Sequence, residues 1–90
     1  MDIEVINELN TLIEDVINSY TKADAASSLR RLEFLSGQVK PQVNPYAAEK
    51  LSQAVNYAKN AAGSVAQKEK RMANAKQAWY LFEREVDVSD

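Results

Sequence analysis

The chain contains 90 residues with a mass of 10.1 kDa, and we expect a single helical domain over 1–90, since a domain usually holds about 100–200 residues. It has no histidine, no cysteine and only two glycines, so the usual general base, thiol nucleophile, soft metal ligands and glycine-rich phosphate loop are missing. We therefore expect a protein that is not an enzyme and takes no cofactor or metal ion. Charged residues interrupt every apolar stretch well before about 18–20 residues, so no membrane partner is expected. The absence of cysteine and an acidic start unlike a signal peptide predict a cytoplasmic protein.

The small net charge of −2 conceals a strong segregation of charge along the chain. Residues 1–36 carry seven acids against three bases, residues 37–82 carry seven bases against two acids, and residues 83–90 carry four acids against one base. No acid and base lie four residues apart, the spacing that lets them pair along one helix. We expect the charges to balance between helices or against a partner.

An amphipathic helix is predicted from Asp2 to Tyr20, because large apolar residues recur there every three or four positions. The opposite side of this helix is an acidic face with four carboxylates: Glu4, Glu8, Glu14 and Asp15. Two interpretations of the acidic face stay open. It is an ordinary solvated surface, or it imitates a phosphate backbone and occupies the nucleic-acid-binding groove of a target protein.

The apolar stripe changes phase at residues 20–24, which predicts a bend or a break there. Thr21 and Asp24 have the spacing of a capping box, in which the hydroxyl caps a new helix. The first arm, over residues 2–36, is therefore one slightly bent helix or two helices. We expect it to stop at Gly37, because glycine readily takes the left-handed conformation that closes a helix.

A loop is predicted at residues 37–45, which contain both prolines and one of the two glycines. Asn44 is a suitable N-cap and Pro45 a suitable first residue for the next helix. In the second arm, over residues 45–87, mostly apolar side chains recur at alternating intervals of three and four residues, and many of them are alanine. Gly63 lies in its middle, and both a continuous helix and a kink there stay open.

These elements predict an all-α fold. The first hypothesis is an antiparallel helical hairpin with a coiled-coil-like, alanine-rich seam. Two copies would assemble into a four-helix bundle, because a lone hairpin buries only one side of each helix. The alternative is a compact monomeric three- or four-helix bundle, formed if the chain breaks at both 20–24 and Gly63.

One segment of the second arm carries apolar side chains around the whole helix, which is more than a single seam requires. We predict a protein interface formed by four residues: Trp79, Tyr80, Leu81 and Phe82. Aromatic side chains are enriched at the buried centres of interfaces. The same segment would belong to the core if the arms place it beside Ile3, Val5 and Ile6.

A basic stretch at residues 50–76 makes contact with nucleic acid a weaker hypothesis. Its candidate residues are Lys59, Lys68, Lys70, Arg71 and Lys76. They do not share one helical face, and a pI near 5.1 disfavours general affinity for nucleic acid. Lys68 also interrupts the apolar seam, along which its methylenes can pack while its ammonium group reaches water. In the first arm, Phe34 lies off the apolar face beside Arg30.

The sequence thus favours a small non-enzymatic module that binds another protein and self-associates as a homodimer. It would act as an inhibitor or adaptor that presents its acidic helix face. The alternatives are a nucleic-acid-associated protein that uses residues 50–76, or a structural component of a larger oligomer. The identity of the protein partner does not follow from the sequence.

Overall fold

The first helix follows the predicted amphipathic pattern. In the computed structural model, which describes residues 1–86, α1 spans Ile3–Ile17. Its N-cap is Asp2, whose carboxylate accepts a hydrogen bond from the backbone N–H of Glu4 at 2.9 Å. The buried side chains of α1 are Ile6, Leu9, Ile13, Val16 and Ile17. The helix thus turns one apolar stripe inward and leaves the acidic face on the outside.

The chain reverses direction directly after α1, where the sequence predicts a bend or a break. Thr21 is the N-cap of α2 (Lys22–Val39), and its hydroxyl accepts a hydrogen bond from the backbone N–H of Asp24 at 3.0 Å. The predicted start of a second helix is therefore confirmed, and the two parts of the first arm are separate antiparallel helices.

The predicted helix stop at Gly37 is wrong. The helix α2 continues through Gly37 to Val39, and a short 3-10 turn, η1 (Lys40–Gln42), follows it. Val39 is buried in the core, and this burial offsets the cost of about 1 kcal/mol that a glycine imposes inside a helix. The connection between the arms is accordingly shorter than the predicted loop.

The next helix, α3 (Pro45–Ala61), begins as the sequence predicts. The side-chain oxygen of Asn44 accepts a hydrogen bond from the backbone N–H of Ala47 at 2.8 Å, and proline occupies the first helical position. A continuous helix over the whole second arm is wrong, since the chain leaves helical structure after Ala61 and enters it again at α4 (Lys68–Glu85). The predicted end of this arm at residue 87 lies outside the described residues.

The break in the second arm is built around Gly63. This residue has a φ of 70°, and a Cβ atom there would lie 3.0 Å from the backbone nitrogen of Lys22 and 3.3 Å from the Cα atom of Thr21. Its N–H donates a hydrogen bond to the carbonyl oxygen of Ser19 at an N···O distance of 3.5 Å. The turn between α3 and α4 therefore rests on the turn between α1 and α2, at a separation that suits glycine.

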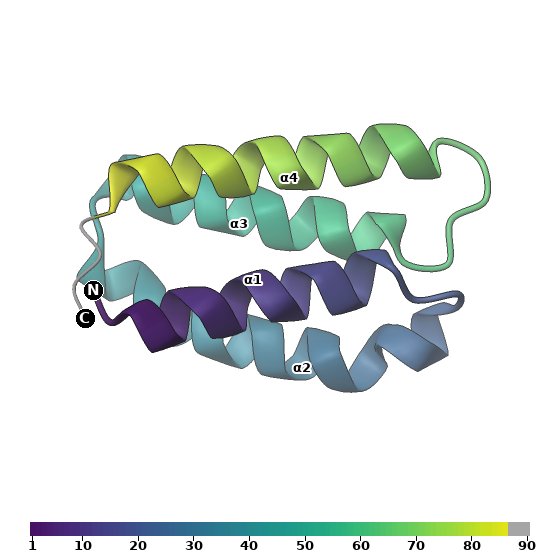
Figure 1. Cartoon of the computed structure of the whole chain (residues 1–90), viewed down its shortest axis with the longest axis horizontal. Helices are drawn as coiled ribbons and strands as arrows, with labels where there is room; N and C mark the ends of the chain where they lie inside the picture. Colours follow the sequence, from purple (N-terminus) through teal and green to yellow (C-terminus); the bar gives the residue numbers. More distant parts are fainter. Residues whose placement is uncertain (87–90) are drawn as a thin grey trace.

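The four helices run alternately in opposite directions around one core (Figure 1). Helix α1 packs against α2, α4 packs chiefly against α3, and α1 and α3 also touch each other, whereas α2 and α4 lie apart. The bundle measures 36 × 22 × 19 Å. The predicted all-α fold is confirmed, and the arrangement is the alternative of a compact four-helix bundle within one chain, because the chain reverses fully both after α1 and after α3.

The alanine-rich pattern serves the contact between α3 and α4. Ala54 and Ala58 on α3 and Ala75 on α4 are fully buried, and such small side chains let two helix backbones approach closely. The steps of three and four residues thus belong to two antiparallel helices that pack on each other. Val65, which the pattern places within the seam, lies on the turn and is 97% exposed.

Candidate functional site

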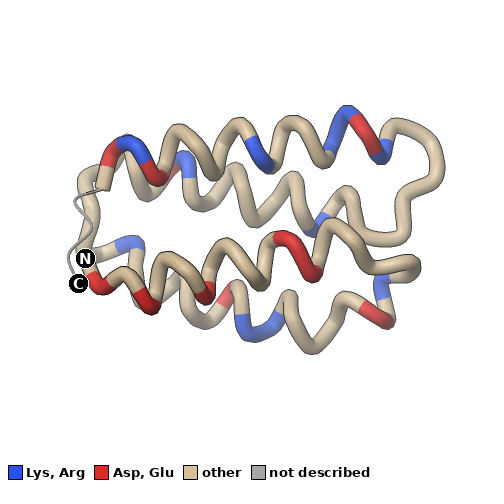
Figure 2. The backbone as a smooth tube through the Cα atoms, in the orientation of Figure 1, with Lys and Arg blue, Asp and Glu red and all other residues tan. Residues whose placement is uncertain are grey.

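The acidic face of α1 is a line of carboxylates on the exposed side of the helix. At about 100° per residue, Glu4, Glu8 and Asp15 project within about 40° of one another, and the exposed side chain of Thr11 lies among them. Glu14 lies to one side of this line and is partly buried. The helix carries no lysine or arginine, and Figure 2 shows acidic positions alone among the charged ones along it.

One member of the acidic face is held by α2. The guanidinium group of Arg31 donates to both carboxylate oxygens of Glu8, from Nε at 2.8 Å and from Nη2 at 3.2 Å. These hydrogen bonds and the positive charge lower the pKa of Glu8 and raise the pKa of Arg31. Within residues 2–86, Glu4, Glu14 and Asp15 form no ion pair. Three carboxylates of the acidic face therefore keep their charge available to a partner.

Cations gather at the end of the bundle where the two turns meet. Lys68 donates from Nζ to the carbonyl of Ser19, two residues beyond the end of α1, at 3.3 Å. Lys22 donates from Nζ to the carbonyl of Lys59 at 3.3 Å. Arg71 donates from Nη1 to the carbonyl of Asn60 at 3.0 Å. The last two carbonyls belong to the C-terminal end of α3, where C=O groups without a partner in the helix and the helix dipole attract positive charge, and the first belongs to the turn after α1.

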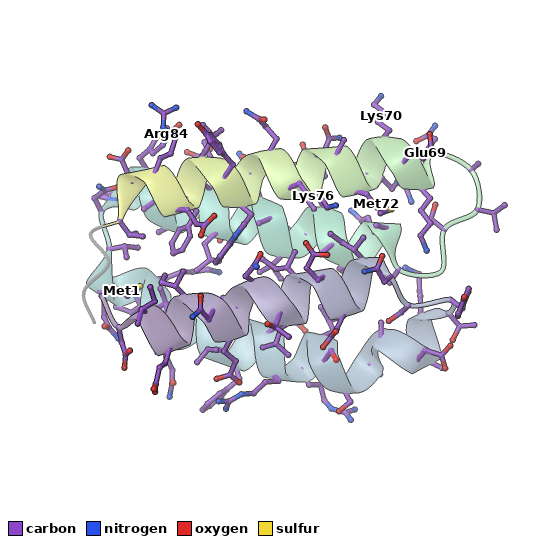
Figure 3. All side chains as sticks on the ribbon, in the orientation of Figure 1. Met1, Glu69, Lys70, Met72, Lys76 and Arg84 are labelled. Carbon is purple, nitrogen blue, oxygen red and sulfur yellow. The ribbon has the colours of Figure 1, made fainter. Side chains whose placement is uncertain are left out.

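The five residues predicted to contact nucleic acid accordingly do not form one continuous surface. Lys68 and Arg71 bind the helix ends, and the exposed Lys59 lies at the end of α3. Figure 3 shows Lys70 on the outer side of α4, whereas Lys76 points from α4 toward the side on which α1 lies. Binding of nucleic acid by these residues stays a prediction, and two of the five side chains already serve the fold.

The four residues of the predicted interface in α4 separate into two that are buried and two that are at least partly exposed. Trp79 and Phe82 are only 6% and 0% exposed, and their ring centroids lie 5.2 Å apart within the core that also contains Ile6. Of the two interpretations that the sequence leaves open for these residues, burial within the single chain supports the core, and their part in an interface stays a prediction. Tyr80 is 50% exposed and Leu81 is partly exposed, so these two are the accessible candidates for contact with a partner.

Three exposed aromatic rings each lie beside a cation of the same helix. Arg31 lies 5.9 Å from the ring centre of Phe34. The other two pairs are Tyr46 with Lys50, at 5.2 Å, and Tyr80 with Arg84, at 5.5 Å. The sequence contains the signal for these two pairs, since each cation follows its tyrosine by four residues.

Other kinds of site find no support in the described part of the chain. Within residues 1–86, no helix combines the length and the apolar character needed to cross a bilayer, and no group of three or more carboxylates is placed to hold a metal ion. Comparisons of the chain with protein-family models, with curated proteins and with solved structures find no match. The chemistry of the surface is therefore the basis for a functional proposal.

Proposed function

We propose that this protein is a non-enzymatic binding module that presents the acidic face of α1 to a basic surface of another protein. The observation that supports the proposal is the line of carboxylates on a helix without cations, of which only Glu8 is paired within residues 2–86. Complementary charge accelerates association and excludes partners of the wrong sign. An inhibitor or adaptor that occupies a basic groove of its target fits this surface.

The bundle supplies a rigid platform for the acidic face. The apolar stripe of α1 is buried against α2 and α3, and the bidentate contact with Arg31 fixes the position of Glu8. A surface that is already ordered loses little conformational entropy when a partner binds. The proposed mechanism is therefore docking without refolding, in which the partner displaces water from the exposed carboxylates.

A photo-crosslinking experiment in the native cells tests this proposal. Thr11 is replaced by p-benzoylphenylalanine, because this exposed residue lies among the carboxylates. Gln77 on α4 is also exposed and provides the control position. We expect a defined protein to be crosslinked from position 11 and not from position 77.

The dependence on charge is tested in the same experiment by Glu4→Lys together with Asp15→Lys. These positions are chosen because reversal of Glu8 would also break its contact with Arg31. The dipole of α1 disfavours a lysine in its first turn and favours one in its last, so the effects of the two changes on stability oppose each other. Loss of the crosslink in a folded double variant supports the proposal, and an undiminished crosslink contradicts it.

The second candidate is association with nucleic acid through the basic stretch. It is favoured by the gathering of Lys22, Lys59, Lys68 and Arg71 at one end of the bundle. It predicts that a labelled oligonucleotide binds at low salt and that affinity falls steeply as salt is added. Anisotropy measurements that show no binding at low salt would exclude it.

Self-association as a homodimer, or within a larger oligomer, is a separate proposal. The sequence argument for it was that a lone hairpin leaves its apolar seam uncovered. The single chain covers that seam with its own helices, so this argument no longer applies, and self-association now needs support from the oligomeric state in solution.

A further inference from the structure

A groove with an apolar floor lies between α2 and α3. It has a volume of about 270 Å³. Its floor is formed by four aliphatic side chains: Ala25, Ala26, Leu29 and Ala62. Three of these are alanines, so the side chains leave space between the two helices that larger residues would fill. Leu29 is partly exposed and is the largest apolar side chain that lines the groove.

The rim of the groove is positively charged. Lys22, Arg30 and Lys59 line it, and no acidic residue among residues 1–86 does. The ammonium group of Lys22 binds the backbone carbonyl of Lys59. The side chains of Arg30 and Lys59 are exposed, and neither forms an ion pair or hydrogen bond within the described part of the chain. Two cations are thus free to bind carboxylates beside an apolar floor.

The size of the groove indicates what can fill it. Pockets for drug-sized molecules and cofactors have volumes of about 300–1,000 Å³, and this groove of about 270 Å³ lies below that range. It suits one large side chain of a peptide. None of the described residues that line it is aromatic, so these residues offer no platform on which a nucleic-acid base could stack.

A second copy of the chain does not supply the matching group through its acidic face. The exposed line on α1 contains Glu4, Thr11 and Asp15 but no large apolar side chain between the carboxylates. The groove requires both kinds of group together, a carboxylate for the rim and an apolar side chain for the floor. This excludes the acidic face of a second copy as the occupant, and the complementary charge of the rim points to an acidic segment of a different protein.

We propose that the groove between α2 and α3 binds an acidic peptide segment of a partner protein, which inserts one large apolar side chain between flanking carboxylates. This surface is distinct from the acidic face of α1 and has the opposite charge. A chain with two such surfaces can join a basic partner to an acidic one, which extends the proposed function from a single contact to a bridge.

The test uses the full chain labelled with ¹⁵N and the blocked peptide Asp-Asp-Phe-Asp-Asp as the probe. Two peptides serve as controls, one with serine in place of phenylalanine and one with lysine in place of every aspartate. We expect the probe to shift the backbone amide signals of residues 22–30 and 59–62 in a saturable manner. Both control peptides are expected to bind about tenfold more weakly or less.

Matched charge variants distinguish the groove from general electrostatic attraction. Arg30→Glu with Lys59→Glu reverses two cations of the rim, whereas Lys70→Glu with Lys76→Glu makes the same change in net charge on α4. We expect the first pair to weaken binding of the probe by about tenfold or more and the second pair to leave it within about twofold.

Several outcomes would overturn the proposal. They are the absence of signal shifts at millimolar peptide, equal shifts from either control peptide, and equal losses from the two charge variants. Tighter binding of a thymidine oligonucleotide to the same amides would show that the rim recognises phosphate instead. None of these results bears on the crosslink from position 11, so failure here is distinguishable from failure of the proposed function.

Discussion

The guanidinium group of Arg31 on α2 holds both carboxylate oxygens of Glu8 on α1, with N···O distances of 2.8 and 3.2 Å. The two residues lie 23 positions apart in the chain, so their contact ties the first two helices together. It also shows one way in which the segregated charges of the sequence are balanced between helices. Along the exposed line of the acidic face, Glu8 is fixed in place, whereas Glu4 and Asp15 are not paired within residues 2–86.

This contact predicts a pH-dependent contribution to stability. Arg31 lowers the pKa of Glu8 in the folded chain below its usual value near 4.5, so the ionised carboxylate stabilises the fold above that value. The contribution disappears as pH falls through the lower, folded-state pKa. We expect Glu8→Gln to lower the thermal midpoint slightly at neutral pH and to have no effect at about pH 2. Glu33→Gln, which removes an exposed carboxylate that has no ion pair with any other described residue, provides the control. An equal loss at both pH values would show that the charge of Glu8 is not responsible.

The two glycines predict substitutions of opposite effect. At Gly63 the backbone is left-handed, and an added Cβ would lie 3.0 Å from the backbone nitrogen of Lys22. We expect Gly63→Ala to lower the free energy of unfolding by about 1–3 kcal/mol. Gly37 lies within α2, and an added Cβ would have no contact within 4 Å outside the local helix backbone. Gly37→Ala is therefore expected to raise the free energy of unfolding by about 0.5–1 kcal/mol. Urea unfolding followed by circular dichroism measures both, and equal effects at the two positions would contradict the described turn.

Substitutions in α4 separate core residues from surface residues. Phe82 is fully buried, and we expect Phe82→Ala to lower the free energy of unfolding by about 3–5 kcal/mol, with a smaller loss for Phe82→Leu. Tyr80 is half exposed and contacts Arg84, so Tyr80→Ala is expected to cost less than about 1 kcal/mol. Similar losses for the alanine variants at both positions, measured by urea unfolding, would contradict the burial described for Phe82.

Local chemistry made parts of the fold predictable from the sequence. The caps at Thr21 and Asn44 depend on one side chain and a backbone N–H three residues later, so spacing alone indicates them. The stop at Gly37 was predicted wrongly, because a local preference for glycine at helix ends was outweighed by burial of Val39 beyond it. In this chain, local sequence signals therefore predict helix starts correctly, whereas the end of α2 depends on tertiary packing that local signals do not contain.

The surfaces were harder to predict, because they depend on which helices become neighbours. The hydrophobicity of Trp79 predicts that its side chain is buried. The apolar pattern around it, however, fits both the core of a single chain and an interface between two chains. The groove joins Ala25 on α2 to Lys59 on α3 and to Ala62 directly after it, and no periodicity connects residues so far apart in the sequence. The acidic face was visible in advance, since its carboxylates lie on a single helix.

All the surfaces described here depend on one claim, that a single chain completes its own core and leaves the outer faces of its helices free. The most direct test is the molar mass by light scattering over about a hundredfold range of concentration, with helicity followed on the same samples. We expect a constant mass near 10.1 kDa and unchanged helical content at every concentration. A mass of twice this value, with loss of helix on dilution, would show that a second copy completes the core and would contradict the account.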